Sequence, residues 1–143
     1  MTLNQLIKGK IFGIVLLLSS YMLVAQTGSM VSPEKVRLEK SYRQVVTQYE
    51  NRPEAAIKAL KALLPELKPF HGLELDCYNS MIYFYVDANR LDSAVQLGAQ
   101  LLDKALAYKD YDKVCHAYNT LSHTHSSVGE LEISRSMLVA GME

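Results

Sequence analysis

The feature of this sequence that most limits its fold is a segment that occurs twice. Residues 51–64 read NRPEAAIKALKALL and residues 89–102 read NRLDSAVQLGAQLL, so the second copy begins 38 residues after the first. The copies share the Asn-Arg pair at their start, one alanine (Ala56 and Ala94) and the two leucines at their end. A period of this length is typical of stacked helical hairpins. The duplication therefore predicts an all-α chain built from repeated helix pairs.

A second duplication supports the first. Residues 78–81 (YNSM) return 40 residues later as residues 118–121 (YNTL). Each helix pair alone would expose an apolar side, which stacking against the next pair buries. We therefore expect an α-solenoid of about three antiparallel helix pairs. The repeats are predicted at about residues 32–69, 71–108 and 111–143, within one domain at residues 32–143.

Prolines mark several of the predicted helix ends. Ser32 and Pro33 suit the N-cap and the first position of a helix, and Pro53 suits the start of a second one. Pro65 and Pro69 are expected to end or kink this second helix, because proline lacks the N–H donor that an α-helix needs. The other four predicted helices span residues 71–88, 91–108, 111–127 and 130–142.

The first 25 residues have the pattern of a secretory signal peptide. Two lysines precede an apolar run at residues 11–25, which is shorter than the ~20 residues that a membrane-spanning helix needs. We expect cleavage after Ala25, a short linker at residues 26–31 and an exported protein, periplasmic or extracellular. Leu23, at position −3 relative to this cleavage, is larger than the small residue usual there, so an uncleaved membrane anchor is the alternative.

Composition argues against two classes of protein. The formal net charge is zero and the pI is about 6.9, so a general nucleic-acid-binding surface is not expected. Two cysteines, Cys77 and Cys115, are too few for a disulfide-built domain. They fall on neighbouring helices, where a bridge would need Cα atoms within about 7 Å. We favour two free, buried thiols over a disulfide.

The second and third repeats carry similar residues at positions that are 40 residues apart. The matching pairs are Tyr78 and Tyr118, Met81 and Leu121, Asn89 and Gly129, and Ala94 and Ser134. Tyr85 in the second repeat and Leu131 in the third also suit this pattern. This pattern resembles the tetratricopeptide repeat (TPR) family over roughly residues 36–142, with a turn residue between the helices and a small residue where they cross. Ile82 and Ser122 depart from that family, as do spacings of 38 and 40 residues instead of 34. A generic helical solenoid or small bundle is the alternative fold.

The histidines do not form a convincing metal site. His116 and His123 share a helix face, but seven residues of helix span ~10.5 Å, too far for one ion without further ligands. His125 falls at a core position of the repeat and is expected to pack there. The sequence also lacks a nucleophile constellation and a phosphate-binding glycine loop. We therefore expect no catalytic residue, no metal and no cofactor.

Polar residues of the first helices are expected to line a concave groove. They are Asp76, Asn79, Tyr83 and Asp87 in the second repeat, and His116, Asn119, His123 and Ser127 in the third. Asn79 and Asn119 occupy the same position of the repeat, so their amides could grip an extended peptide backbone. The alternative is a solvated polar face. TPR proteins that hold a terminal carboxylate use lysine and arginine in this groove, and these positions offer no comparable cations.

These observations favour a non-enzymatic protein- or peptide-binding scaffold of the cell envelope, such as the sensing or docking portion of a larger TPR-containing regulator. The expected partner is a protein or peptide, with no nucleic acid and with membrane contact only through an uncleaved N-terminal segment. The alternative is a structural or assembly subunit. Residues 137–143 are largely apolar and no polar capping helix follows them, so we expect continuation of the array or pairing with another chain there, including a homo-oligomer.

Overall fold

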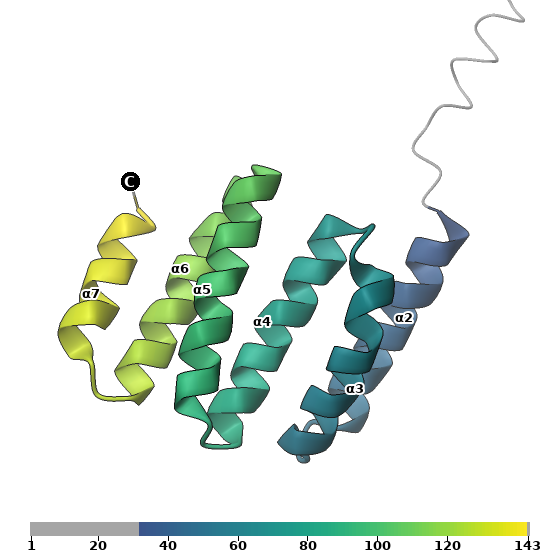
Figure 1. Ribbon diagram of the computed structural model, residues 1–143, viewed down its shortest axis with the longest axis horizontal. Helices are drawn as coiled ribbons and strands as arrows, with labels where there is room; N and C mark the ends of the chain where they lie inside the picture. The colour runs from purple at the N-terminus through teal and green to yellow at the C-terminus, as the bar shows by residue number, and fades with distance from the viewer. Residues whose placement is uncertain (1–31, 143) are drawn as a thin grey trace, which may run out of the picture. The chain divides into compact units, whose positions relative to one another are not determined.

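The computed structural model describes residues 32–142 (Figure 1). The chain divides into two units, Met1–Pro33 and Glu34–Glu143, and nearly all described residues belong to the second. These residues contain no strand and form six helices: α2 (Pro33–Gln48), α3 (Pro53–Leu67), α4 (His71–Asp87), α5 (Leu91–Tyr108), α6 (Tyr111–Ser127) and α7 (Leu131–Ala140). The predicted all-α fold is therefore confirmed.

The N-terminal predictions concern a part of the chain that is not described. The signal peptide at residues 1–25 and the linker at residues 26–31 lie outside the described residues. Within residues 32–142, no helix combines the length and the apolar composition that crossing a membrane requires.

The turns follow the predicted residues closely. Pro53 is the first residue of α3, where its missing N–H costs nothing. Asn89 and Gly129 both adopt the left-handed backbone conformation, with φ of 57° and 83°. Glycine and asparagine adopt this conformation more readily than other residues, so each can reverse the chain after a helix. Lys109 takes the same conformation between α5 and α6 with φ of 55°, which the sequence did not predict.

Helix α3 continues past Pro65 to Leu67, because a proline in the last turn removes one backbone hydrogen bond only, and it ends just before Pro69, the second of the two predicted prolines. Two other predicted helix ends need correction. Helix α4 ends at Asp87, one residue before the predicted end. Helix α7 covers Leu131–Ala140 and is shorter than the predicted 130–142. The other two predicted spans, 91–108 and 111–127, are those of α5 and α6.

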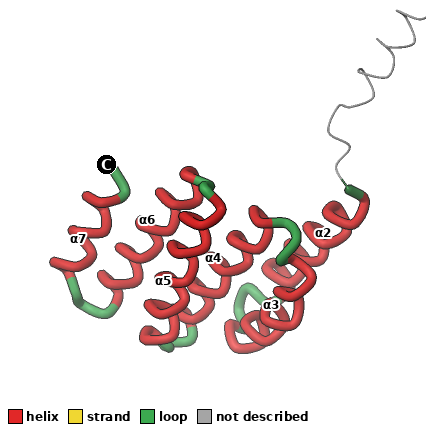
Figure 2. The backbone as a smooth tube through the Cα atoms, turned by 45° about the horizontal axis from the view of Figure 1, so that its top comes forward, coloured by secondary structure: helices red, strands yellow, loops and turns green. Residues whose placement is uncertain are grey.

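Within the second unit, consecutive helices lie side by side in chain order (Figures 1 and 2). Helix α4 contacts the helices before and after it, α3 and α5, and also contacts α6, the first helix of the following pair. Helix α2 reaches α4 through Tyr42, whose hydroxyl lies 2.7 Å from Ser80 Oγ. The first helices of successive pairs therefore touch one another, as a repeat-like fold requires.

A small residue recurs where the two helices of each pair meet. Ala56, Ala94 and Ser134 are each the fourth residue of their helix, and all three are buried. In the last pair the contact is polar, because Ser134 Oγ lies 2.9 Å from Ser122 Oγ. Ser122 stands where α4 has the fully buried Ile82. A hydrogen-bonded serine pair thus stands at the repeat positions that carry the buried Ile82 and Ala94 in the preceding pair, with both hydroxyls satisfied.

A buried carboxylate joins α4 to α5. The side chain of Glu74 is fully buried and accepts hydrogen bonds from Lys104 Nζ at 2.9 Å and from the Tyr108 hydroxyl at 2.6 Å. The ring of His71 stacks on Tyr108 with 3.7 Å between centroids, and Lys104 Nζ lies 5.4 Å from the centroid of Tyr78. This cluster is not apparent from the sequence, because its members alternate with core residues along α4 and α5.

The surroundings of Glu74 set its protonation state. Burial by itself would raise the pKa of the carboxyl group, since it disfavours the charged form. The hydrogen bonds from Tyr108 and Lys104 outweigh burial, and the pKa of Glu74 lies below its ordinary value of 4.5. Glu74 is therefore ionised at neutral pH. Because its pKa is lowered by folding, it stabilises the fold above pH 4.5, and this contribution is lost as pH falls through the folded pKa.

We predict that Glu74→Gln lowers the free energy of unfolding by about 1–3 kcal/mol at pH 7, because it leaves a partly buried ammonium without its carboxylate. The same substitution should flatten the loss of stability between about pH 5 and pH 3. Urea unfolding across this pH range measures both effects. Glu54→Gln is the matched control, since its ion pair with Arg90 is exposed and should contribute less than about 1 kcal/mol. Equal losses in the two variants would contradict the assignment.

Helices α5 and α6 approach each other closely at Gly98. A Cβ atom on Gly98 would lie 2.5 Å from Leu121 Cδ2 and 3.0 Å from Leu121 Cγ. A leucine on α6 therefore occupies the space that a side chain on α5 would need. The two helices therefore touch at Gly98.

We predict that Gly98→Ala lowers the free energy of unfolding by about 1–2 kcal/mol, because the steric cost exceeds the gain in helix propensity. Gly72→Ala is the matched control. Gly72 also lies in a helix, but no atom lies within 4 Å of the Cβ position there, so the substitution should stabilise the chain by up to about 1 kcal/mol. Urea denaturation measures the difference. If both variants are more stable than the unchanged chain, the close approach of Leu121 to Gly98 does not limit the residue at position 98.

Candidate functional site

The predicted groove residues of α4 mostly contact α6. Asp76 forms an ion pair with Lys113 Nζ, and Asn79 Oδ1 accepts a hydrogen bond of 2.8 Å from Thr120 Oγ1. The ring of Tyr83 lies 6.2 Å from that of His123, tilted by 55°. Tyr83 and His123 are therefore brought together across α4 and α6, whereas Asp76 and Asn79 contact residues of α6 outside the predicted set. Asp87 is exposed, and no hydrogen bond or ion pair involves its side chain among the described residues.

The four predicted residues of α6 are all exposed: His116, Asn119, His123 and Ser127. Ser127 Oγ donates a hydrogen bond of 2.9 Å to the carbonyl oxygen of His123 in the preceding turn. His116 borders a small cavity of about 90 Å³ between α4 and α6, together with Asp76 and Lys113. We call the exposed row of Tyr83, Asp87, His116, His123 and Ser127 the concave face, after the groove that the sequence predicts.

The two asparagines do not act as a matched pair. Asn79 and Asn119 are 40 residues apart and hold the same position in the repeat. Asn79 is partly buried and its amide oxygen is already bound to Thr120, whereas Asn119 is exposed. A peptide could therefore use the side chain of Asn119, but reaching that of Asn79 would require breaking a contact between two helices. The sequence could not reveal this difference between the two asparagines, because it depends on which side chains of another helix lie beside each of them.

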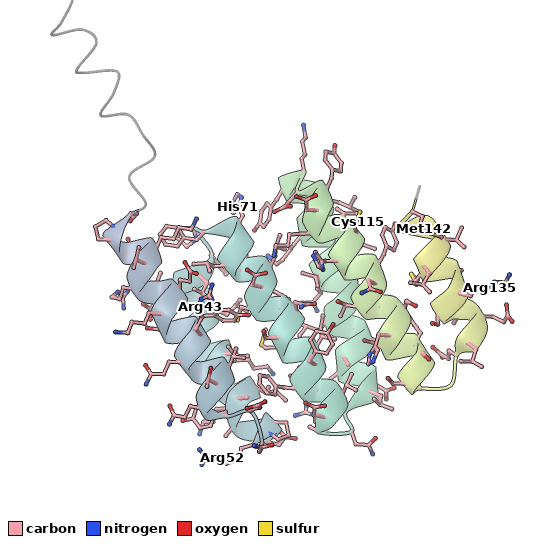
Figure 3. The ribbon with its side chains drawn as sticks, turned by 180° about the vertical axis from the view of Figure 1, so that it is seen from behind. Arg43, Arg52, His71, Cys115, Arg135 and Met142 are labelled. Atoms are coloured by element: carbon pink, nitrogen blue, oxygen red, sulfur yellow. The ribbon has the colours of Figure 1, made fainter. Side chains whose placement is uncertain are left out.

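An open pocket lies beyond α6, at a place that the sequence analysis did not single out. It has a volume of about 200 Å³, and its lining residues are Cys115, Tyr118, Asn119, Leu138, Gly141 and Met142. Figure 3 shows Cys115 on α6 and Met142 just after α7, on neighbouring elements. Leu138 and Met142 are 46% and 78% exposed, so this surface, which we call the end face, is apolar and uncovered.

A polar groove of about 410 Å³ runs between α3 and α5, away from the predicted site. Its floor includes Tyr78 and Tyr85, and its rim carries Lys61 and Arg90. Both cations lie over the ring of Tyr85, at 5.5 Å and 4.9 Å from its centroid. Arg90 also pairs with Glu54 at 3.3 Å. These cations are therefore engaged in contacts between helices, and we assign no ligand to this groove.

The histidines of α6 lie in different surroundings. His125 is buried at the core position, and its Nδ1 lies 2.6 Å from Glu130 Oε2, so it packs and joins α6 to the turn before α7. His116 and His123 are exposed on α6. Among residues 32–142, no group of three or more histidine, cysteine or acidic side chains has a geometry that could hold a metal ion.

Both cysteines are free, and their surroundings differ. Cys77 is fully buried, and its Sγ lies 3.7 Å from the carbonyl oxygen of Leu60. Burial, with smaller effects from Glu74 and Asp76, raises the pKa of the Cys77 thiol to about 12. Cys115 is exposed, so the prediction of two buried thiols is right for Cys77 and wrong for Cys115. Cys115 is exposed because no described helix covers its side of α6.

We predict that a thiol reagent modifies one cysteine of the native protein within minutes and the second only after unfolding. Cys115 is accessible, whereas Cys77 is buried and its high pKa leaves almost no thiolate at pH 8. The absorbance released from Ellman's reagent, with and without urea, measures how many thiols react quickly in the native protein and how many react only after unfolding. Cys115→Ser should abolish the fast class and Cys77→Ser the slow class. Two fast thiols in the native protein would contradict the placement of Cys77.

Comparisons of this chain with protein-family models, with curated proteins and with solved structures gave no match.

Proposed function

We propose that this chain is a TPR-like helical solenoid that binds a protein or an extended peptide and performs no catalysis. The observation that carries the proposal is the concave face. Tyr83 is 42% exposed beside His123, and the exposed side chains of Asp87, His116 and Ser127 lie on the same two helices. Aromatic rings and short polar side chains on rigid helices offer contact area and hydrogen bonds at little cost in conformational entropy.

The composition of this face favours a particular class of ligand. Its exposed acid is Asp87, while Asp76 is paired with Lys113, so the face carries no free cation among these residues. A peptide with neutral or basic side chains suits it better than a terminal carboxylate. The signal-peptide pattern of the first 25 residues supports a location in the cell envelope, periplasmic or extracellular, where the scaffold would serve as a sensing or docking portion.

The proposal predicts that the double variant Tyr83→Ala, His123→Ala captures its partner from envelope extract at least about tenfold less than the unchanged chain, because both rings lose their contact with it. Both side chains are exposed, so the fold should persist, as circular dichroism can check. Asp103→Ala, an exposed substitution on α5, is the control that should leave capture unchanged. Asn79 is unsuitable for this test, because its substitution would also break the contact with Thr120.

Unchanged capture by the double variant would remove the concave face as the site. Loss of capture in the Asp103→Ala control as well would mean that the effect is not local to that face.

A structural or assembly subunit is the second candidate, favoured by one observation. Helix α7 and the residue pair after it expose five large apolar side chains: Leu131, Ile133, Leu138, Val139 and Met142. Apolar patches of this kind commonly mark a protein interface. Sedimentation velocity over a dilution series separates the candidates, since a permanent assembly through α7 should stay associated at micromolar concentration and below.

A further inference from the structure

The cavity of about 90 Å³ between α4 and α6 is lined by two kinds of residue. Leu75 of α4 and Leu101 of α5 are 0% and 3% exposed and give it an apolar floor. Its polar lining residues are Asp76, Asn79, Lys113 and His116. A site that holds a ligand usually combines an apolar lining with a few converging polar groups. Helices α4 and α6 contact each other and face the viewer in Figure 3, and His116 also belongs to the concave face.

The size of the cavity limits what it can hold. Pockets for whole small molecules usually have volumes of about 300–1,000 Å³. A water molecule takes about 30 Å³ in the liquid, so this cavity has room for about three atoms of that size. It can therefore take one small chemical group, attached to a longer ligand that lies on the concave face.

Two opposite charges border the cavity and are joined to each other. Lys113 Nζ forms an ion pair with Asp76 Oδ1, and the two side chains remain 29% and 39% exposed. A ligand carboxylate would meet the charge of Asp76, and a ligand ammonium would meet that of Lys113. Like charges at short range are unfavourable. The ion pair therefore disfavours a ligand group of either charge.

The hydrogen-bonding atoms of the cavity include donors and acceptors. Asp76 Oδ2 is an acceptor, and Lys113 Nζ has N–H groups beyond the one that it gives to Asp76; neither has a further partner among the described residues. The exposed ring of His116 can donate or accept. Asn79 serves as wall only, because its amide oxygen is held by Thr120 at 2.8 Å. A group that satisfies these atoms must both donate and accept.

A primary carboxamide meets these requirements of size, charge and hydrogen bonding. It is uncharged, it carries N–H donors and a carbonyl acceptor, and its carbon, oxygen and nitrogen atoms match the room available. A hydroxyl group also donates and accepts, but its single oxygen would leave most of the cavity unfilled. Asparagine and glutamine are the residues whose side chains end in a carboxamide.

We propose that the cavity between α4 and α6 binds the side-chain carboxamide of a glutamine or asparagine in the peptide that lies on the concave face. The carboxamide nitrogen donates to Asp76, its oxygen accepts from Lys113, and its carbon atoms lie against Leu75 and Leu101. This inference rests on the peptide-binding role proposed for the concave face, and it identifies one residue type of the bound peptide.

Blocked amino acids of matched shape test the cavity without the partner. The probes are the N-acetyl methylamides of glutamine, glutamate and ornithine, whose side chains end in an amide, a carboxylate and an ammonium group. Methyl NMR spectra of the full chain with isotope-labelled leucines follow Leu75 and Leu101 as each probe is added to about 100 mM, since groups of this size bind weakly. We expect the glutamine derivative to shift both sets of signals and to bind at least about fivefold more tightly than the other two.

Two variants test whether the ion pair sets this preference. Asp76→Asn leaves the charge of Lys113, so the glutamate derivative should gain at least about fivefold in affinity and overtake glutamine. Lys113→Gln leaves the charge of Asp76 and should favour the ornithine derivative in the same way. An ion pair with a structural role alone would lower stability in both variants and keep the order of the probes. Asp92→Asn, an exposed substitution in the first turn of α5, is the matched control and should preserve the preference for glutamine.

Free glutamine separates two sources of the carboxamide, a peptide side chain and a free amino acid. We expect free glutamine to bind no more tightly than its blocked derivative, because its carboxamide would take the ion pair at which its charged ends could otherwise be held. Binding of free glutamine about tenfold more tightly than the blocked form would assign the cavity to a free amino acid and overturn the inference.

Three further outcomes would overturn the inference: equal affinity for the three probes, no methyl shift at the highest concentration, and an unchanged order of the probes in both charge variants. The first two use the unchanged chain, so they hold even where a variant fails to fold. The cavity would then contain water alone.

The inference and the proposed function fail in different experiments. Tyr83 and His123 do not line the cavity, so their double variant should bind the glutamine derivative as the unchanged chain does. Loss of the glutamine preference in a chain that still captures its partner overturns the inference alone. Unchanged capture by the double variant removes the concave face as the site, and with it the peptide that would carry the carboxamide.

Discussion

The contact between each first helix and the preceding helix pair is the interaction on which the rest of this fold depends. It is both apolar and directional. Leu121 fills the space left by Gly98, and Thr120, one residue before it, binds the amide of Asn79. The apolar contact supplies most of the free energy, since burial of a leucine contributes about 1.5–3 kcal/mol. The hydrogen bond adds less but fixes which residues face each other.

The contact between α4 and α5 is fixed in a different way. Glu74 is fully buried, and the hydrogen bonds from Lys104 and Tyr108 offset its cost of desolvation. We infer that this cluster sets the register of the two helices, because sliding either helix by one turn would leave a buried carboxylate without donors. An apolar contact of similar area would tolerate such a shift more easily.

The sequence predicted those features that depend on a residue and its near neighbours. Proline at position 53 and the turn residues Asn89 and Gly129 set helix ends through their own backbone preferences, and the duplicated segments gave the number of helix pairs. Burial of Glu74 and exposure of Cys115 depend instead on which helix lies alongside. Glutamate is rarely fully buried and cysteine often is, so residue type alone would predict an exposed Glu74 and a buried Cys115, the opposite of what the structure shows. The engagement of Asn79 was hidden for the same reason.

The concave face and the end face differ in what the fold requires of them. Tyr83 and His123 touch across α4 and α6 while both remain exposed, so they can vary without uncovering the core. The end-face residues occupy positions whose equivalents hold the interior together, as Leu75 and Asn79 do under α6. Asn119 keeps the residue type that serves this purpose at position 79. The exposed side chains of the concave face can therefore change freely, whereas Asn79 and Leu121 must keep fitting a neighbouring helix.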